Sequence, residues 1–72
     1  MKVRELYNQT VRRLRQGNIP DEALEAELLL RFFLGLSRVE FFLADHELSR
    51  PDLDQFETLF CRRLAREPLA YL

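Results

Sequence analysis

Hydrophobic residues recur at helical spacing through most of the chain. Between residues 3 and 16 a spacing of three and four places them on one helix face, at Val3, Leu6, Tyr7, Val11 and Leu14. We expect this helix to end at Gly17, because glycine readily takes the left-handed conformation that follows a helix end. Pro20 should open a second helix that runs to about Leu34, since the first turn of a helix does not need the N–H that proline lacks. Apolar residues cover most of the circumference in the second half of that helix, which predicts burial on several sides.

Two serines mark the starts of two further helices. Each has an acidic residue three positions later, the spacing of a capping box, in which hydroxyl and carboxylate each accept a hydrogen bond from a backbone amide. Ser37 and Glu40 predict a short third helix that gives way to the polar residues 45–47. Ser49 and Asp52 predict the start of a fourth.

The fourth helix should carry one apolar face and end near Arg66. The positions on that face are Leu53, Phe56, Leu59, Phe60 and Leu64. Pro68 limits the helix, because proline disfavours helical geometry at the residue before it. No strand pattern or internal repeat is present, so the predicted fold is all-α, a small bundle of four to five helices.

Composition and charge restrict the function. At 72 residues, with 47% hydrophobic and 32% charged side chains, the chain holds one small core. The net charge of -1 argues against nucleic acid as the main partner, because duplex binding needs a surplus of Lys and Arg. No apolar run approaches the roughly 20 residues of a membrane span, and a single cysteine suits a reducing compartment. We therefore expect a cytoplasmic domain without a membrane segment.

Few residues offer catalytic chemistry. Cys61 and His46 are the single cysteine and histidine, too few ligands for a zinc site. Cys61 has no base in its own segment, so we expect an ordinary, partly buried helix residue, and we interpret His46 as a solvated or capping loop residue. Gly17 and Gly35 are isolated, so they form no nucleotide-binding loop. The sequence predicts no catalytic, cofactor-binding or metal-binding residue in this chain.

Two groups of residues leave a structural and a binding role open. Arginines cluster near the ends of the first and fourth helices, where they suit the helix dipole or dock on an acidic protein surface: Arg12, Arg13, Arg15, Arg62, Arg63 and Arg66. Two phenylalanine doublets, at 32–33 and 41–42, belong to the core or to an interface. The core is the commoner fate of aromatic residues at helical spacing.

Three stretches carry a family resemblance. The first is the turn Gly-Asn-Ile-Pro at 17–20, and the second runs from Glu25-Ala26 to Leu34-Gly35-Leu36-Ser37-Arg38, which is similar to a Glu-Ala-x-x-Leu-Leu and Leu-Gly-x-x-Arg pattern. The third, residues 60–71, is similar to Arg-Arg-x-x-Gly-Glu-Pro-x-Ala-Tyr, with Arg66 where glycine is usual. These stretches resemble the N-terminal domain of the HemK/PrmC family, the protein-(glutamine-N5) methyltransferases that modify peptide chain release factors.

The resemblance implies a division of work along a longer polypeptide. Residues 1–67 would form a helical substrate-recognition domain that is not catalytic, and residues 68–72 would start the linker to a catalytic methyltransferase domain after Leu72. That second domain would hold S-adenosylmethionine and methylate the glutamine of the Gly-Gly-Gln loop of a release factor. The expected partners are the release factor and the chain's own catalytic domain.

The resemblance and the charge pattern together give candidate site residues. Those for docking the release factor are Arg12, Arg13, Arg62, Arg63 and Arg66. Those for the joint to the catalytic domain are Pro68, Ala70 and Tyr71.

Two other functions remain as alternatives. One is a free-standing helical adaptor that buries a partner helix against Phe33, Phe42 or Leu69. The other is a helix-turn-helix nucleic-acid binder, for which the basic first helix is the only candidate to enter a groove.

Overall fold

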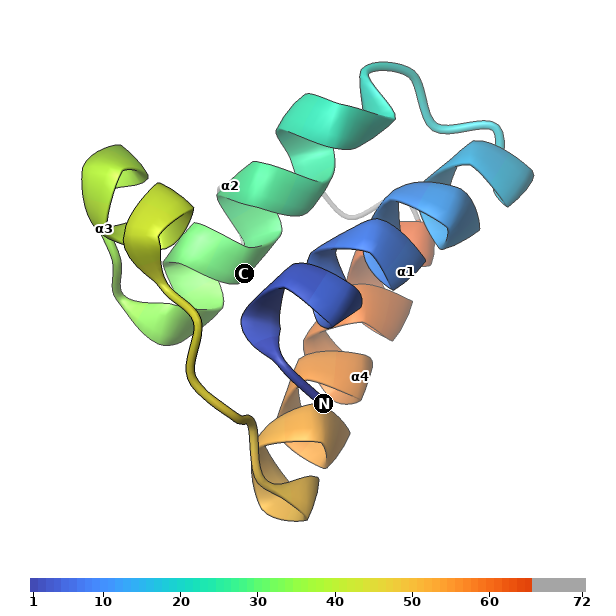
Figure 1. The fold of residues 1–72 in the computed structure, drawn as a ribbon. Helices are drawn as coiled ribbons and strands as arrows, with labels where there is room; N and C mark the ends of the chain where they lie inside the picture. The colour runs from blue at the N-terminus through green and yellow to red at the C-terminus, as the bar shows by residue number, and fades with distance from the viewer. Residues whose placement is uncertain (66–72) are drawn as a thin grey trace.

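The computed structural model describes residues 1–65, which form four helices (Figure 1). They are α1 (Val3–Gln16), α2 (Glu22–Leu34), α3 (Arg38–Leu43) and α4 (Arg50–Leu64). Within these residues the only β pairing is an isolated antiparallel bridge between Lys2 and Glu47. The all-α bundle predicted from the sequence is therefore confirmed. No helix among residues 1–65 is long and apolar enough to cross a membrane.

The helices surround one apolar core. α1 and α2 lie side by side and antiparallel, α4 packs behind them, and α3 sits at the far end of α2 (Figure 1). The Phe56 and Phe60 rings of α4 stack with their centres 6.2 Å apart, and Phe33 of α2 meets Phe56 edge-on at 5.5 Å. The buried apolar side chains come from every helix and are Val3, Leu6, Leu14, Ile19, Ala26, Leu29, Leu30, Phe41, Leu48, Phe56 and Phe60.

α1 ends where the sequence predicts, with Gly17 as its C-cap, but the left-handed residue that follows the helix is not the glycine. Gly17 has an ordinary φ of -84°, and Asn18 takes the left-handed conformation at φ 59°, which asparagine tolerates. The N–H of Ile19 donates to the carbonyl of Leu14 at 3.1 Å, the long hydrogen bond of a Schellman motif. Gly17 meets a different need, because a Cβ there would lie 3.2 Å from Cδ2 of Leu64. The glycine lets α4 approach α1 closely.

The start of α2 also differs from the prediction. The helix begins at Glu22, two residues after Pro20, and Asp21 is left-handed at φ 55°. The chain reverses between α1 and α2 with left-handed residues at both Asn18 and Asp21, and the side chain of Ile19 between them is buried. Pro20 therefore belongs to the turn and does not open the helix.

The two phenylalanine doublets each divide between core and surface. Phe33 is half-buried and Phe41 fully buried, whereas Phe32 is 56% exposed and Phe42 52% exposed. Adjacent helix residues point about 100° apart, so one ring of each pair faces outward. The expected burial of α2 on several sides is wrong at Phe32.

The two predicted capping boxes are present. Oγ of Ser37 accepts from the N–H of Glu40 at 3.2 Å, and the Glu40 carboxylate accepts from the N–H of Ser37 at 2.8 Å. Ser49 and Asp52 repeat this exchange at 3.3 and 3.2 Å. Each box satisfies backbone donors that a helix start leaves unpaired.

The first residues are tied to the connection between α3 and α4. The N–H of Leu48 donates to the carbonyl of Met1 at 2.9 Å, and that of Val3 donates to the carbonyl of His46 at 3.3 Å. The Met1 ammonium group pairs with Glu47 at 2.9 Å. His46 is exposed in this connection, as expected for a loop histidine, while Leu48 is buried in the core.

Replacing Phe60 with alanine should destabilise the domain severely. The ring is fully buried, and truncating such a side chain removes its packing and leaves a cavity, which costs about 3–5 kcal/mol of unfolding free energy. Urea unfolding followed by circular dichroism measures the change. The matched control is Leu43→Ala, at a side chain that is 78% exposed, and it should leave the urea midpoint nearly unchanged. Equal effects of the two substitutions would contradict the packing described.

Candidate functional site

Arg13, from the first arginine cluster, is held between α1 and α4. Its guanidinium donates two hydrogen bonds to the carboxylate of Glu57, at 2.7 and 2.8 Å, and lies 4.4 Å from the centre of the Phe60 ring. Paired bonds suit the planar guanidinium, and the face of the ring attracts its charge. Arg13 thus covers the buried ring and joins the two helices.

Arg63, from the second cluster, makes the corresponding contact between α4 and α2. Its Nε and Nη2 donate to the two carboxylate oxygens of Glu25 at 3.1 and 2.9 Å. The two side chains are only 17% and 22% exposed. Because the pair is partly buried, dissolved salt weakens its electrostatic attraction less than that of an exposed pair.

These contacts shift pKa values toward the charged forms. The hydrogen bonds from Arg13 lower the pKa of Glu57 below its usual value, and the same bonds raise the pKa of Arg13. Hydrogen bonding to Glu25 raises the pKa of Arg63 in the same way. The fold therefore holds these groups in the protonation states that keep α4 in place.

The five candidate docking arginines fall into three groups. Arg13 and Arg63 hold helices together, so each has a structural role whatever else it does. Arg12 on α1 and Arg62 on α4 have exposed side chains. Arg66 lies outside the described residues. Docking stays a prediction for all five.

The other predicted binding residues near the C-terminus lie outside the described part of the chain. This applies to the proposed inter-domain joint, Pro68, Ala70 and Tyr71, and to Leu69, one of the residues of the adaptor hypothesis.

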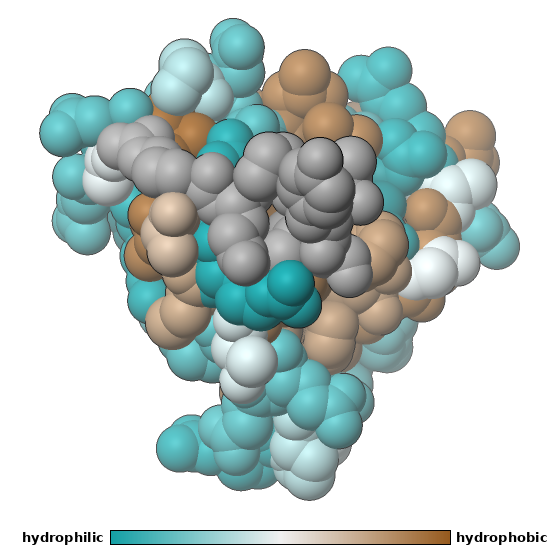
Figure 2. Space-filling model, turned by 180° about the vertical axis from the view of Figure 1, so that it is seen from behind, coloured by the Kyte–Doolittle hydropathy of each residue, from teal (hydrophilic) through white to brown (hydrophobic). Residues whose placement is uncertain are grey.

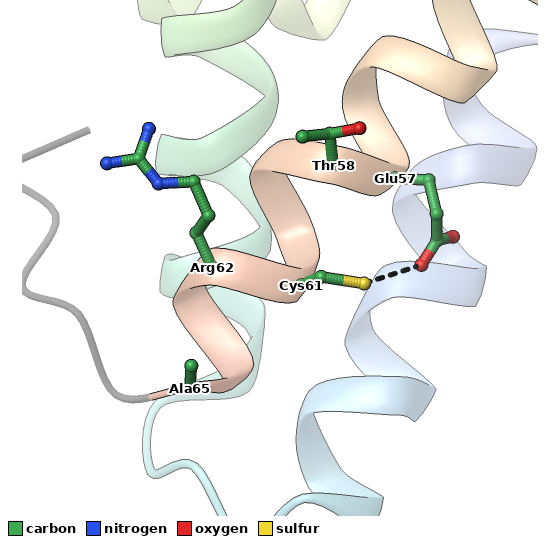
Figure 3. Close-up of a pocket in the computed structure, with 5 residues that line it drawn as sticks. All are labelled: Glu57, Thr58, Cys61, Arg62 and Ala65. Atoms are coloured by element: carbon green, nitrogen blue, oxygen red, sulfur yellow. Dashed lines mark hydrogen bonds between the residues drawn. The ribbon is translucent and has the colours of Figure 1, made fainter.

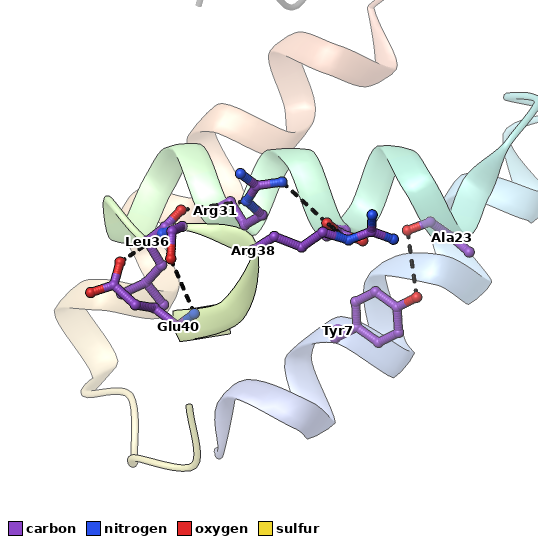
Figure 4. A network of polar contacts seen from close by, with 8 residues as sticks. Tyr7, Ala23, Arg31, Leu36, Arg38 and Glu40 are labelled. Atoms are coloured by element: carbon purple, nitrogen blue, oxygen red, sulfur yellow. Dashed lines mark hydrogen bonds and ion pairs between the residues drawn. The ribbon is translucent and has the colours of Figure 1, made fainter. Parts of the chain in front are cut away.

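A buried carboxylate links α2 to the turn before α3. Glu27 is only 7% exposed, and its Oε2 lies 3.2 Å from Nη1 of Arg31 and 3.3 Å from Nε of Arg38. Arg31 also donates to the carbonyl of Leu36 at 3.4 Å (Figure 4). Two guanidinium groups offset the desolvation of this carboxylate. The cluster holds α3 against the C-terminal end of α2.

A shallow groove of about 500 Å³ lies on α4 (Figure 3). Its described lining residues are Glu57, Thr58, Cys61, Arg62 and Ala65. Cys61 is exposed, so the predicted partial burial is wrong, and its thiol donates to Glu57 at 3.4 Å. Hydrogen bonding to that carboxylate raises the pKa of Cys61 above its usual value.

The described glycines have structural positions in the bundle. Gly17 packs close to Leu64, and Gly35 ends α2 with a φ of 68°, so neither belongs to a glycine-rich loop. Residues 1–65 contain no group of three His, Cys, Asp or Glu side chains placed to hold a metal ion.

Known proteins with similar sequences give the family of this chain. The profile of the PrmC N-terminal domain matches residues 5–72. The chain belongs to the PrmC N-terminal domain family. A curated relative, the bifunctional methyltransferase of Rickettsia felis (strain ATCC VR-1525 / URRWXCal2), is 31% identical over 72 residues, which is 97% of this chain but 14% of the relative. No solved structure gave a significant match.

The family resemblance seen in the sequence is thereby confirmed, and in this PrmC N-terminal domain several motif residues make structural contacts. Glu25 binds Arg63, which joins the second motif stretch to the third, and Arg38 binds Glu27. Sequence reasoning missed Glu25, Glu27 and Glu57 as the partners of arginines. A signal was available on α2, because carboxylates set among apolar residues need a cation.

The Arg63–Glu25 pair should contribute to stability through direct coupling. A double-mutant cycle with Arg63→Ala and Glu25→Ala should give a coupling free energy of about 1 kcal/mol by urea unfolding, since the pair is bidentate and partly buried. Arg50 and Asp54 are the control pair, at 3.5 Å and 84% and 68% exposed, and their coupling should be smaller. Coupling that is equal in the two pairs would count against a special role for Arg63.

Acid should weaken the Arg13–Glu57 pair. The folded state lowers the pKa of Glu57, so the stabilisation is complete above the ordinary carboxyl pKa and is lost as the pH falls through the lowered folded-state value. Wild type should therefore exceed Glu57→Gln in unfolding free energy at neutral pH, and the difference should shrink as the solution is acidified. Urea unfolding of both proteins across this range measures it, and a constant difference would exclude the linkage.

Proposed function

We propose that this PrmC N-terminal domain is the substrate-recognition part of a longer S-adenosylmethionine-dependent methyltransferase. Its substrate is the glutamine of the Gly-Gly-Gln loop in a peptide chain release factor. The proposal is carried by the family match over residues 5–72, in a chain that spans only 14% of a relative named as a methyltransferase. Because translation termination takes place in the cytoplasm, we propose that location as well.

The role proposed for the domain is positioning. Cys61 lies on α4 and His46 in the connection between α3 and α4, and the proposal assigns a catalytic role to neither. A catalytic domain elsewhere in the polypeptide would hold the cofactor and the glutamine amide. A second contact with the release factor, made by this domain, raises the effective concentration of the glutamine at the catalytic site and restricts its orientation.

The charges on α1 do not favour nucleic acid as a partner. Arg13 is bound to α4, Arg15 pairs with Glu22 at 3.1 Å, and Arg4 donates to the carbonyl of Phe42 at 3.4 Å. These side chains are used within the domain, whereas nucleic-acid binding needs basic groups presented to phosphates.

The adaptor remains the second candidate function because Phe42 is 52% exposed. Phe33 offers less to a partner, since it is half-buried and its ring packs edge-on against Phe56.

Removing the domain should impair methylation of the whole release factor but not of a short peptide. We expect a methyltransferase that lacks residues 1–65 to show about a tenfold lower kcat/KM on the intact release factor, because the second contact with that substrate is lost. Its kcat/KM on a peptide that contains Gly-Gly-Gln should stay the same. Transfer of radiolabelled methyl groups from S-adenosylmethionine measures both.

The peptide serves as the control for an intact catalytic domain. Undiminished activity on the release factor would refute the recognition role, and an equal loss on both substrates would mean that the domain supports catalysis itself. Calorimetry of the 72-residue chain with S-adenosylmethionine should show no binding, and a measurable affinity would contradict the proposed placement of the cofactor.

A further inference from the structure

Three neighbouring apolar side chains of α3 face the solvent. Val39 is 69% exposed, Phe42 52% and Leu43 78%, and together we call them the α3 face. Residues 39, 42 and 43 are three and four positions apart, so they share one side of the helix. Figure 2 views the molecule from behind, and the side where α3 lies shows brown hydrophobic surface at the right-hand edge.

The fold holds the α3 face in place without covering it. A capping box fixes the start of α3, and Arg38, which binds Glu27, also lies 5.7 Å from the centre of the Phe42 ring. Arg4 of α1 donates to the carbonyl of Phe42 at 3.4 Å. A face fixed in this way loses little conformational entropy when it binds a partner.

The size of the α3 face restricts the kind of partner. Three side chains of this kind expose roughly a few hundred Å², the range in which apolar patches mark interaction sites. A stable dimer buries about 800 Å² on each partner, so a second copy of the chain finds too little area here. The α3 face suits a partner that is held at the same time by another contact.

The α3 face and the C-terminal end of α4 are separated across the molecule. In Figure 1, α3 and the C-terminal end of α4 lie on opposite sides of the molecule.

We propose that the α3 face docks on an apolar surface of the protein substrate, at a distance from the glutamine that is methylated. This inference rests on the proposed function, since the catalytic domain supplies the other contact. It identifies a docking surface that differs from the arginine clusters and acts through apolar burial.

The double variant Val39→Ser with Leu43→Ser, made in the full-length methyltransferase, tests the proposal. Both side chains are mostly exposed, so the urea midpoint should change little. We expect KM for the intact release factor to rise about tenfold, because two apolar contacts at the centre of the interface are lost. Methylation of the Gly-Gly-Gln peptide should be unchanged.

Two further variants make the comparison specific. Leu24→Ser changes a leucine of α2 that is 52% exposed and distant from α3 along the helix, and it should behave as wild type. Val39→Ile with Leu43→Met keeps the face apolar and should retain the wild-type KM. Rescue by this pair supports apolar docking.

The outcomes separate this inference from the proposed function. If removal of the domain raises KM but the serine variant does not, the α3 face is not the docking surface. If neither change affects the release factor, the recognition role itself fails. Sedimentation equilibrium provides a third outcome, because a dimer of wild type that the serine variant abolishes would make a second copy the occupant and overturn the proposal.

Discussion

Phe60 is the side chain through which α4 joins the rest of the domain. The Phe60 side chain is fully buried and its ring stacks on that of Phe56. The guanidinium group of Arg13, from α1, lies over the Phe60 ring. Glu57 lies three residues before it and Arg63 three residues after it, so the acid and the base flank the ring on its two sides along α4. Burial of the ring supplies the free energy, and the two ion pairs on either side of it set the position of the helix.

α4 contributes charges of opposite sign to the two ion pairs, which makes the helix arrangement specific. α4 offers a carboxylate to the arginine of α1, at Glu57, and an arginine to the carboxylate of α2, at Arg63. Exchanging the two neighbours of α4 would bring like charges together. A small apolar core is compatible with several helix packings, and paired charges of this kind select one of them.

The polar contacts of this domain therefore maintain its shape, and the recognition we propose depends on what they leave exposed. Glu25, Glu27, Arg13, Arg38 and Arg63 are engaged with one another or with neighbouring helices. Motif residues of the family thus explain why the bundle folds in one way. In the proposed function, partner binding is left to the α3 face, whose three exposed side chains lie outside the core.

Local interactions explain the features that the sequence predicted correctly. The capping boxes at Ser37 and Ser49 involve residues three positions apart, and the bounds of α1 follow from its apolar periodicity. Such signals lie within one or two turns of chain, so no tertiary information is needed to find them. The same holds for the absence of a glycine-rich loop from the sequence, since the composition already shows it.

Contacts between distant residues decided the rest. Position 17 favours glycine because a Cβ there would crowd Leu64 of α4. The chain reverses after α1 through two residues, Asn18 and Asp21, in the left-handed conformation. Arg13 binds Glu57, which is 44 positions away in the sequence, and Arg63 binds Glu25, which is 38 positions away. Neither ion pair could therefore be recognised from neighbouring residues in the sequence. The sequence by itself determined which segments become helices, because helix formation depends on near neighbours. Only the tertiary structure decided which charges are used inside the bundle and which apolar side chains remain outside it, because both depend on how the helices pack.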